Sequence, residues 1–307
     1  FIGFNLIKKL VKKKFNLLIL DNLQRKKILN KDQNFILKSR YIKFRKFDLT
    51  KPINIKDYNF DLIFNFAAIL GVRIVNKYPY ETLYKNIEIA KNLIDFCKKQ
   101  KNCKLINFSS SEVYSHLIYE NKIKFPTPEN IDLKILDKTI PRDSYGLSKI
   151  VTEKMCFFSN LNFINIRPHN IYGPDMGYDH VIPELIKKIY YKDKVSIVSP
   201  NHKRAFCFID DAIDQIIKLS FSKNTTNHTF NIGNPNEEIN MFNLAKKIKI
   251  ILGSQTILSK DKKITKGSPK RRVPSLKKYT KICGKLKITK LEDGLNKTIE
   301  WYRNDII

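Results

Sequence analysis

The chain of 307 residues has few of the features that mark membrane, secreted or metal-binding proteins. No stretch reaches the roughly 18 apolar residues of a membrane span, and the longest candidate, residues 62–72, is broken by Asn65. The five cysteines are scattered, and no pair has the spacing of metal ligands. We therefore expect a cytoplasmic protein with no bound metal and no membrane association.

Acidic residues are scarce, since 29 Asp and Glu stand against 58 Lys and Arg and give a formal net charge of +29. Such a balance can indicate binding to nucleic acid or another polyanion. The lysines are spread along the whole chain, however, and Ile, Asn and Phe, which AT-rich genomes over-use, are abundant. We attribute most of the charge to composition and do not expect a nucleic-acid partner. A positive field would still help to recruit a phosphorylated substrate.

Apolar runs of strand length alternate with amphipathic stretches of helix length, which predicts an α/β fold with a parallel sheet covered on both faces. In the first part, strands are predicted at residues 15–21, 41–47, 60–66, 103–108 and 163–167, and the main helices at 79–98 and 144–158. In the last part, helices are predicted at 181–191, 209–219, 241–252 and 291–302, strands at 195–198 and 229–232, and basic loop at 259–274.

The stretch 144–149, Ser-Tyr-Gly-Leu-Ser-Lys, places Tyr145 and Lys149 four residues apart on a predicted helix. Residues four apart share one helix face, and an ammonium beside a phenol lowers the pKa of the phenol. Tyr145 would then serve as a general base near neutral pH. A solvated helix face is the alternative explanation, and Tyr190 and Lys194 have the same spacing by chance.

The segment from Gly3 to Asp21 fits the second half of a dinucleotide-binding unit. Such a unit reads strand, glycine-rich turn, helix, strand and acid, with the acid about 20 residues on. The first strand and the earlier glycines are not in the chain, so we interpret the sequence as an N-terminally truncated fragment. A helix and strand that open another α/β fold are the alternative.

These residues occur in the order found in one family. The ordered motifs are Phe1-Ile2-Gly3, Asp21-Asn22-Leu23, Asp48-Leu49, Ser110-Ser111-Glu112-Val113-Tyr114, Tyr145-Gly146-Leu147-Ser148-Lys149, the segment 167–174, and Arg204 with Asp210-Asp211. Over essentially its whole length the chain resembles the extended short-chain dehydrogenase/reductases, specifically the nucleotide-sugar epimerases and dehydratases. The resemblance implies a Rossmann-like doubly wound parallel sheet in a domain of residues 1–167. It also implies a smaller C-terminal α/β substrate domain of residues 168–307, with some segments returning to the sheet.

The resemblance implies NAD as cofactor. Asp21, at the end of the second strand, would bind the adenosine ribose hydroxyls and disfavour a 2′-phosphate. Asp48 and Leu49 would flank the adenine. The full set of implied cofactor residues is Gly3, Asp21, Asn22, Asp48, Leu49, Ala67, Asn86, Tyr145 and Lys149. Without the first strand and the phosphate-binding turn, the chain as written is expected to bind NAD poorly.

The implied reaction begins at a sugar hydroxyl, most often at C4. Tyr145 would remove the hydroxyl proton while NAD takes the hydride, Lys149 would hold the nicotinamide ribose, and Ser110 would hydrogen-bond the same hydroxyl. Tyr114 is expected to be a packing aromatic, and His169 to pack or bond locally.

Four residues match positions that contact the nucleotide or its pyrophosphate in the family. Arginine suits phosphate because its planar guanidinium binds two oxygens at once. For the two adjacent arginines, a basic surface loop is the alternative interpretation. The implied substrate-binding residues are Asn170, Arg204, Arg271 and Arg272.

Glu112 distinguishes the possible reactions after C4 oxidation. A glutamate two places after Ser110 resembles dehydratases and decarboxylases, whereas the segment 167–177 looks more like sequences described as epimerases. Ser111 stands where dehydratases of thymidine-linked glucose have Asp, which argues against that subgroup. We expect a 4-epimerase, with an NDP-sugar 4,6-dehydratase or a UDP-glucuronate decarboxylase as alternatives.

Two further expectations concern partners. Helices 79–98 and 144–158 resemble the pair that builds the family's homodimer, so a homodimer is expected. The alternative from a different functional class is an inactive fragment or a basic RNA-binding protein, although the intact set of Ser110, Tyr145 and Lys149 argues against decay.

Overall fold

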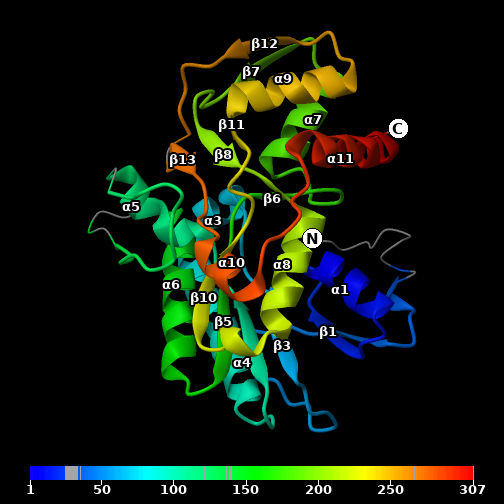
Figure 1. The fold of residues 1–307 in the computed structure, drawn as a ribbon, viewed down its shortest axis with the longest axis vertical. Coiled ribbons are helices and arrows are strands. Elements are labelled where there is room, and N and C mark those ends of the chain that lie inside the picture. The colour runs from blue at the N-terminus through cyan, green and yellow to red at the C-terminus, as the bar shows by residue number, and fades with distance from the viewer. Residues whose placement is uncertain are drawn as a thin grey trace.

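The computed structural model describes residues 1–24, 34, 36–120, 122–135, 137, 140–265 and 267–306. Up to residue 168 the elements are α1 (Ile2–Lys12), β1 (Leu17–Asp21), β2 (Ile42–Lys46), β3 (Leu62–Asn65), α3 (Val72–Lys77), α4 (Pro79–Cys97), β4 (Lys104–Phe108), η1 (Ser111–Tyr114), α5 (Ser115–Tyr119), α6 (Asp143–Phe158) and β5 (Asn162–Pro168). The predicted alternation of strands and helices is confirmed over this part (Figure 1). No helix among the described residues combines the length and apolar character that crossing a membrane requires.

The later elements are β6 (Ile171–Tyr172), α7 (Val181–Tyr191), β7 (Lys194–Ile197), β8 (Lys203–Ala205), β9 (Cys207–Phe208), α8 (Ile209–Phe221), η2 (Lys223–Thr225), β10 (His228–Ile232), β11 (Glu238–Asn240), α9 (Met241–Leu252), β12 (Ile257–Lys260), β13 (Arg271–Arg272), α10 (Lys277–Cys283) and α11 (Leu291–Ile306). The four long helices predicted here are α7, α8, α9 and α11. Local signals explain their bounds: α9, for example, starts where the Asn240 side chain accepts a hydrogen bond from the Asn243 N–H. It ends at Gly253, whose φ of 65° is the left-handed conformation that glycine adopts readily.

The strands up to residue 168 lie in two parallel sheets: a four-stranded sheet of order β10-β5-β4-β3, which the later strand β10 joins, and a two-stranded sheet of β1 and β2. All carboxyl ends within each parallel sheet meet at one edge. β10 comes from the last third of the chain and pairs with β5 in the four-stranded sheet. The parallel α/β architecture expected from the alternation is therefore confirmed.

The two faces of the four-stranded sheet are covered by different helices. Side chains such as Ile106 and Ile164 join the core that holds Leu6 of α1 and the buried face of α8. On the other face, Leu105 and Phe163 pack with residues of α4 and α6. Helices on both faces place the strand ends, rather than the sheet faces, where a ligand can approach.

A row of three buried asparagines crosses this sheet. Asn65, Asn107 and Asn165 are in register on β3, β4 and β5, and at most 4% of each is exposed. Asn65 Nδ2 donates to Asn107 Oδ1 at 3.3 Å, and Asn107 Nδ2 donates to Asn165 Oδ1 at 2.8 Å. Among the described residues, Asn65 Oδ1 and Asn165 Nδ2 at the two ends have no hydrogen-bond partner.

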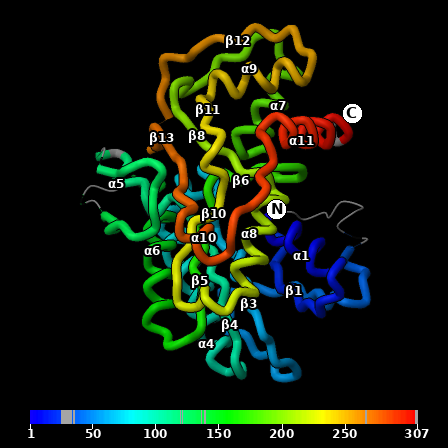
Figure 2. The backbone as a smooth tube through the Cα atoms, viewed as in Figure 1, coloured from blue at the N-terminus to red at the C-terminus, as the bar shows by residue number. Residues whose placement is uncertain are grey.

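The prediction of one basic loop over residues 259–274 is wrong in part. β12 extends to Lys260 and pairs with β7, and β13 pairs with β8 inside this range. Two-residue strands depend on partners far away in sequence, which no local pattern reveals. After β13 the chain runs down to α10 beside β10 (Figure 2), and Pro274 pairs with Thr127 on the way.

Candidate active site

Helix α6 brings Tyr145 and Lys149 together. The helix begins at Asp143, so Tyr145 lies in its first turn and Lys149 one turn later. Lys149 Nζ lies 5.7 Å from the centre of the Tyr145 ring and donates a 2.7 Å hydrogen bond to the Phe108 carbonyl. This bond ties the helix to the carboxyl end of β4. Tyr190 and Lys194, by contrast, lie on α7 and β7 and share no helix face.

The environment of Lys149 changes its acidity. Only 4% of the residue is exposed. Burial lowers its pKa from 10.5 to about 8, against the smaller opposing effects of Glu153 and Cys156. Glu153 is bound by the Arg167 guanidinium through two hydrogen bonds of 2.8 and 2.6 Å, so its charge is largely compensated. A buried lysine of this kind holds its proton weakly beside Tyr145.

Ser110 and Glu112 lie where β4 ends and η1 begins. Ser110 Oγ accepts a hydrogen bond of 3.1 Å from the Glu112 N–H and so caps η1. The start of α6 approaches this turn closely, because Gly146 has no side chain. A Cβ there would lie 3.2 Å from the Glu112 carbonyl oxygen. The absence of that atom allows the first turn of α6 to pack closely against η1.

Three side chains hold the Glu112 carboxylate. Oε1 accepts a hydrogen bond of 2.8 Å from Arg142 and lies 3.1 Å from an Arg272 nitrogen, while Oε2 accepts a 2.8 Å bond from Ser115. Burial alone would raise the pKa of this carboxyl, but Arg272 and then Arg142 outweigh it and hold the pKa well below its usual range. Glu112 is therefore ionised between two guanidinium groups.

Arg272 still has hydrogen-bonding capacity. The residue is 9% exposed, and its Nε has no hydrogen-bond partner among the described residues. Its Nη2 lies 3.1 Å from Glu112 Oε1 and forms an ion pair with it, but the geometry of this contact is not that of a hydrogen bond. A buried donor of this kind favours an additional acceptor at the site.

A buried polar network lies behind these residues. The Tyr114 hydroxyl donates to Asn231 Oδ1 at 2.9 Å and accepts from Arg167 at 2.7 Å. His169 Nε2 lies 3.1 Å from the same Asn231 oxygen. Burial lowers the pKa of His169 to about 3, so its ring is neutral. Local bonding by His169 is confirmed, and Tyr114 is a buried aromatic that also bonds through its hydroxyl.

The candidate cofactor residues at the strand ends accept hydrogen bonds from backbone N–H groups two residues further along the chain. Asp21 Oδ1 accepts from the Leu23 N–H at 2.7 Å, and Asn22 Oδ1 from the Gln24 N–H at 3.1 Å. Asp48 Oδ1 likewise accepts from the Thr50 N–H at 3.0 Å. Asp21 and Asp48 are both exposed at the carboxyl ends of β1 and β2. These bonds hold each side chain in place without removing it from solvent.

The other candidate cofactor residues are more enclosed. Asn86 exchanges hydrogen bonds with the backbone of Ile69 at 2.7 and 3.1 Å and donates to Ser148 Oγ at 3.2 Å. It therefore ties the loop after β3 to α6. Gly3 lies against the Phe66 ring, which a Cβ would approach to 3.3 Å. Two further candidates, Leu49 and Ala67, pack against the cluster around Ile53 and Ile89.

The candidate substrate residues fall into two groups. Arg272 faces Glu112, whereas Arg271 is exposed, binds Glu238 through bonds of 2.7 and 2.8 Å, and covers the Phe125 ring. Arg204 lies beside Arg272 in the β8–β13 pairing and donates to Ser268 Oγ at 3.0 Å. The structure therefore brings Arg204 and Arg272 together and directs Arg271 to the surface.

Asn170 lines a cavity formed by residues of β6, α7 and the segment that precedes β9. Its Nδ2 donates to the Ala205 carbonyl at 3.0 Å. The cavity beside it has a volume of about 110 Å³ and is mostly apolar, with Asn170 and His180 as its polar side chains. Sequence reasoning did not single out His180. It also missed Arg142 and His116, because neither stands in a spacing with a known chemical meaning.

A buried lysine one turn from a tyrosine on a helix, tied to the end of the strand that precedes Ser110, is the arrangement expected of a short-chain dehydrogenase/reductase. The model of the NAD dependent epimerase/dehydratase family matches residues 1–233. The chain belongs to this family.

Relatives with different activities are about equally similar. The UDP-N-acetyl-alpha-D-glucosaminuronate decarboxylase of Bacillus cytotoxicus is 27% identical over 99% of this chain and 95% of its own. The UDP-D-apiose/UDP-D-xylose synthase 1 of Arabidopsis thaliana is 28% identical over 61% of this chain, and the match spans 55% of that relative. Among solved structures, the UDP-glucose 4-epimerase of Thermotoga maritima has a TM-score of 0.84 at 22% identity, covering 100% of this chain and 97% of its own. That likeness establishes the fold.

Proposed function

We propose that this protein oxidises C4 of a nucleoside-diphosphate sugar and that its sugar is a uronic acid, which it decarboxylates. The observation that carries the first part is the buried Lys149 over Tyr145, next to Ser110. The second part is supported by the ionised Glu112 between Arg142 and Arg272. A plain exchange of stereochemistry at C4 gives no reason for two guanidiniums there.

The residues present fit NAD as the cofactor. Asp21 and Asp48 offer exposed carboxylates at the ends of neighbouring parallel strands, where ribose hydroxyls are bound. Lys149 supplies a donor in the same site as Tyr145. When bound, NAD would supply the hydride acceptor for C4 and return the hydride at the end.

The chain's own residues handle the proton. Tyr145, as phenolate, takes the C4 hydroxyl proton, and the Lys149 ammonium stabilises that phenolate. Ser110, whose Oγ accepts a bond from the Glu112 N–H at the end of β4, is proposed to hydrogen-bond the same hydroxyl. The product of this step is a 4-keto sugar.

A 4-keto uronic acid is a β-keto acid, and this chemistry explains the arginines. The bond from C5 to the carboxyl carbon breaks, carbon dioxide leaves, and the electron pair passes to the C4 carbonyl as an enolate. A proton from water adds to C5, and return of the hydride to C4, with the proton that Tyr145 took earlier, would then give a pentose. We propose that Arg272, with its unpartnered Nε, binds and orients the substrate carboxylate, and that the negative charge of Glu112 disfavours the carboxylate form, which is lost when carbon dioxide leaves. For the nucleotide we propose Arg204, Arg271 and, beside the 110 Å³ cavity, Asn170.

A 4-epimerase is the second candidate. It is favoured by the segment 167–177, and it would use Tyr145, Lys149 and Ser110 identically. Glu112 would then only link η1 to its two arginines. A dehydratase would instead require a C6 hydroxyl and the loss of water.

The test is incubation of the full-length protein with NAD and matched NDP-hexoses, NDP-N-acetylhexosamines and their uronic acids, followed by mass spectrometry and chromatography. Loss of carbon dioxide from a uronic acid is expected. Unchanged mass with new retention would replace this proposal by epimerisation, and no reaction with any sugar would refute both. Tyr145→Phe should lower turnover about 100- to 10,000-fold. Tyr190→Phe, with the same sequence spacing, is the matched control.

We also propose a homodimer formed through α4 and α6. Large apolar side chains are exposed on these helices, among them Tyr80 at 73% and Phe158 at 82%. The exposed Tyr80 and Tyr84 rings lie 5.0 Å apart. A second copy of the same helix pair would cover these surfaces.

A further inference from the structure

Two consecutive residues at the start of α6 bind two residues one turn apart on the facing segment. Arg142 binds Glu112 of η1 at 2.8 Å, and Asp143 binds His116 of α5, with Asp143 Oδ1 lying 3.1 Å from His116 Nε2. We call the pairs Arg142–Glu112 and Asp143–His116 the double clamp.

The Asp143–His116 half of the clamp is enclosed and firmly oriented. The two side chains are 13% and 12% exposed. The second carboxylate oxygen, Asp143 Oδ2, accepts a 2.8 Å hydrogen bond from the Ile140 N–H and so closes the turn that precedes the helix. Asp143 therefore fixes the turn before α6 and the distance from this turn to α5.

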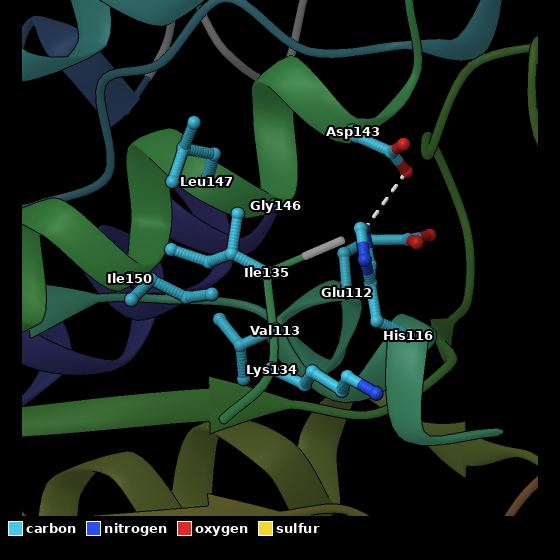
Figure 3. Close-up of a pocket in the computed structure, with 9 residues that line it drawn as sticks. All are labelled: Glu112, Val113, His116, Lys134, Ile135, Asp143, Gly146, Leu147 and Ile150. Carbon is cyan, nitrogen blue, oxygen red and sulfur yellow. Dashed lines mark ion pairs between the residues drawn. The ribbon is translucent and has the colours of Figure 1, made fainter. Parts of the chain in front are cut away.

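A small cavity adjoins this contact. Figure 3 shows Asp143, Glu112 and His116 on one side and the apolar Leu147 and Ile150 on the other, with a dashed line from Asp143 to His116. Its volume is about 20 Å³. The cavity is large enough for about one water molecule, so the contact between Asp143 and His116 bridges a small gap in the packing beside the start of α6.

Tyr145 is two residues beyond Asp143, and Ser110 is just before the segment that carries Glu112 and His116. The spacing of the two groups proposed to share the C4 hydroxyl therefore depends on how the first turn of α6 sits against η1 and α5. A displacement of about 1 Å at reacting groups costs on the order of 100-fold in rate.

We propose that His116 and Asp143 are positioning residues that hold the first turn of α6, and with it Tyr145, at its working distance from Ser110. The inference rests on the proposed function only for its kinetic consequence. The geometric part, that the pair immobilises the start of α6, stands on the contacts alone.

The test combines kinetics with hydrogen exchange in the full-length protein. His116→Leu removes the donor and keeps an apolar side chain, whereas His116→Gln places an N–H near the position of Nε2. We expect His116→Leu to lower kcat by about 10- to 100-fold with KM changed less than about threefold. His116→Gln should recover most of the loss. The backbone amides of residues 143–149 should exchange faster in His116→Leu and at the wild-type rate in His116→Gln.

A double-mutant cycle isolates the pair. Asp143→Ala also removes the bond to Ile140, but this loss is common to the single and the double variant and cancels. The double variant should have a kcat no lower than Asp143→Ala alone. Lys134→Ala is the control, because Lys134 lines the same cavity yet binds Glu120 at 2.5 Å.

The outcomes separate the two proposals. If no sugar is turned over, the exchange rates still decide whether the pair holds α6. If the amides of residues 143–149 exchange at the wild-type rate in His116→Leu, or if the two losses of kcat multiply in the double variant, the proposal that the pair positions α6 is wrong. A kcat loss that His116→Gln does not restore, with normal exchange, would assign His116 a direct chemical role instead.

Discussion

Replacing Lys149 by Met should stabilise the fold and abolish the reaction. Keeping the buried Lys149 ammonium charged costs free energy. The difference between the ordinary lysine pKa of 10.5 and the lowered pKa of about 8 corresponds to about 3 kcal/mol. Losing the bond to the Phe108 carbonyl offsets about 1–2 kcal/mol of this gain. We expect a free energy of unfolding about 1–2 kcal/mol higher than that of the wild type at pH 7, measured by urea denaturation.

The pH dependence gives the sharper test. The folded wild type releases the Lys149 proton near pH 8, whereas the unfolded chain holds it to about pH 10.5. Between these values the unfolded state binds more protons, so wild-type stability rises with pH. The advantage of Lys149→Met should be full below pH 8, vanish near about pH 9 and reverse towards pH 10.5, because the wild type then no longer bears the cost of the buried charge and still has its bond to Phe108. Lys154→Met, exposed on the same helix, should differ from the wild type by less than about 0.5 kcal/mol throughout. A Lys149→Met variant whose stability difference is independent of pH would refute the reasoning.

Two predictions concern other parts of the molecule. Glu153→Gln should lower the free energy of unfolding by about 3–5 kcal/mol, because it leaves the buried Arg167 guanidinium without its carboxylate partner. Adding Arg167→Met should restore part of the lost stability. Urea unfolding in which the two losses of stability simply add would contradict this pairing. Light scattering should give twice the chain mass for the wild type, and Tyr80→Lys combined with Phe158→Lys should shift it to the monomer. A monomeric wild type would remove the dimer.

The α/β order and the catalytic pair could be predicted because their signals are local. Tyr145 and Lys149 lie one turn apart, so helix geometry alone brings them together. Strand-length apolar runs likewise predicted β3, β4 and β5. The pairing of β13 with β8 was not visible, because contacts between residues so far apart in sequence leave no periodic trace.

The surroundings of Glu112 could not be predicted for the same reason. Arg142, Ser115 and Arg272 come from three separate segments, and only the folded chain shows that they share one carboxylate. The sequence also could not separate Arg271 from Arg272. In a strand, neighbouring side chains point to opposite sides, so one arginine lies at the surface and the other inside.

The row of Asn65, Asn107 and Asn165 has a consequence for how the chain finds its correct strand alignment. A strand that slips by two residues still buries the same face, and among Ile, Leu and Phe side chains such an error costs little. With the row present, a strand that slips by two residues separates the paired amides and leaves buried donors and acceptors unsatisfied, at about 1–3 kcal/mol each. The asparagines thus help to specify the strand register, because they make the native pairing of β3, β4 and β5 more stable than pairings shifted by two residues.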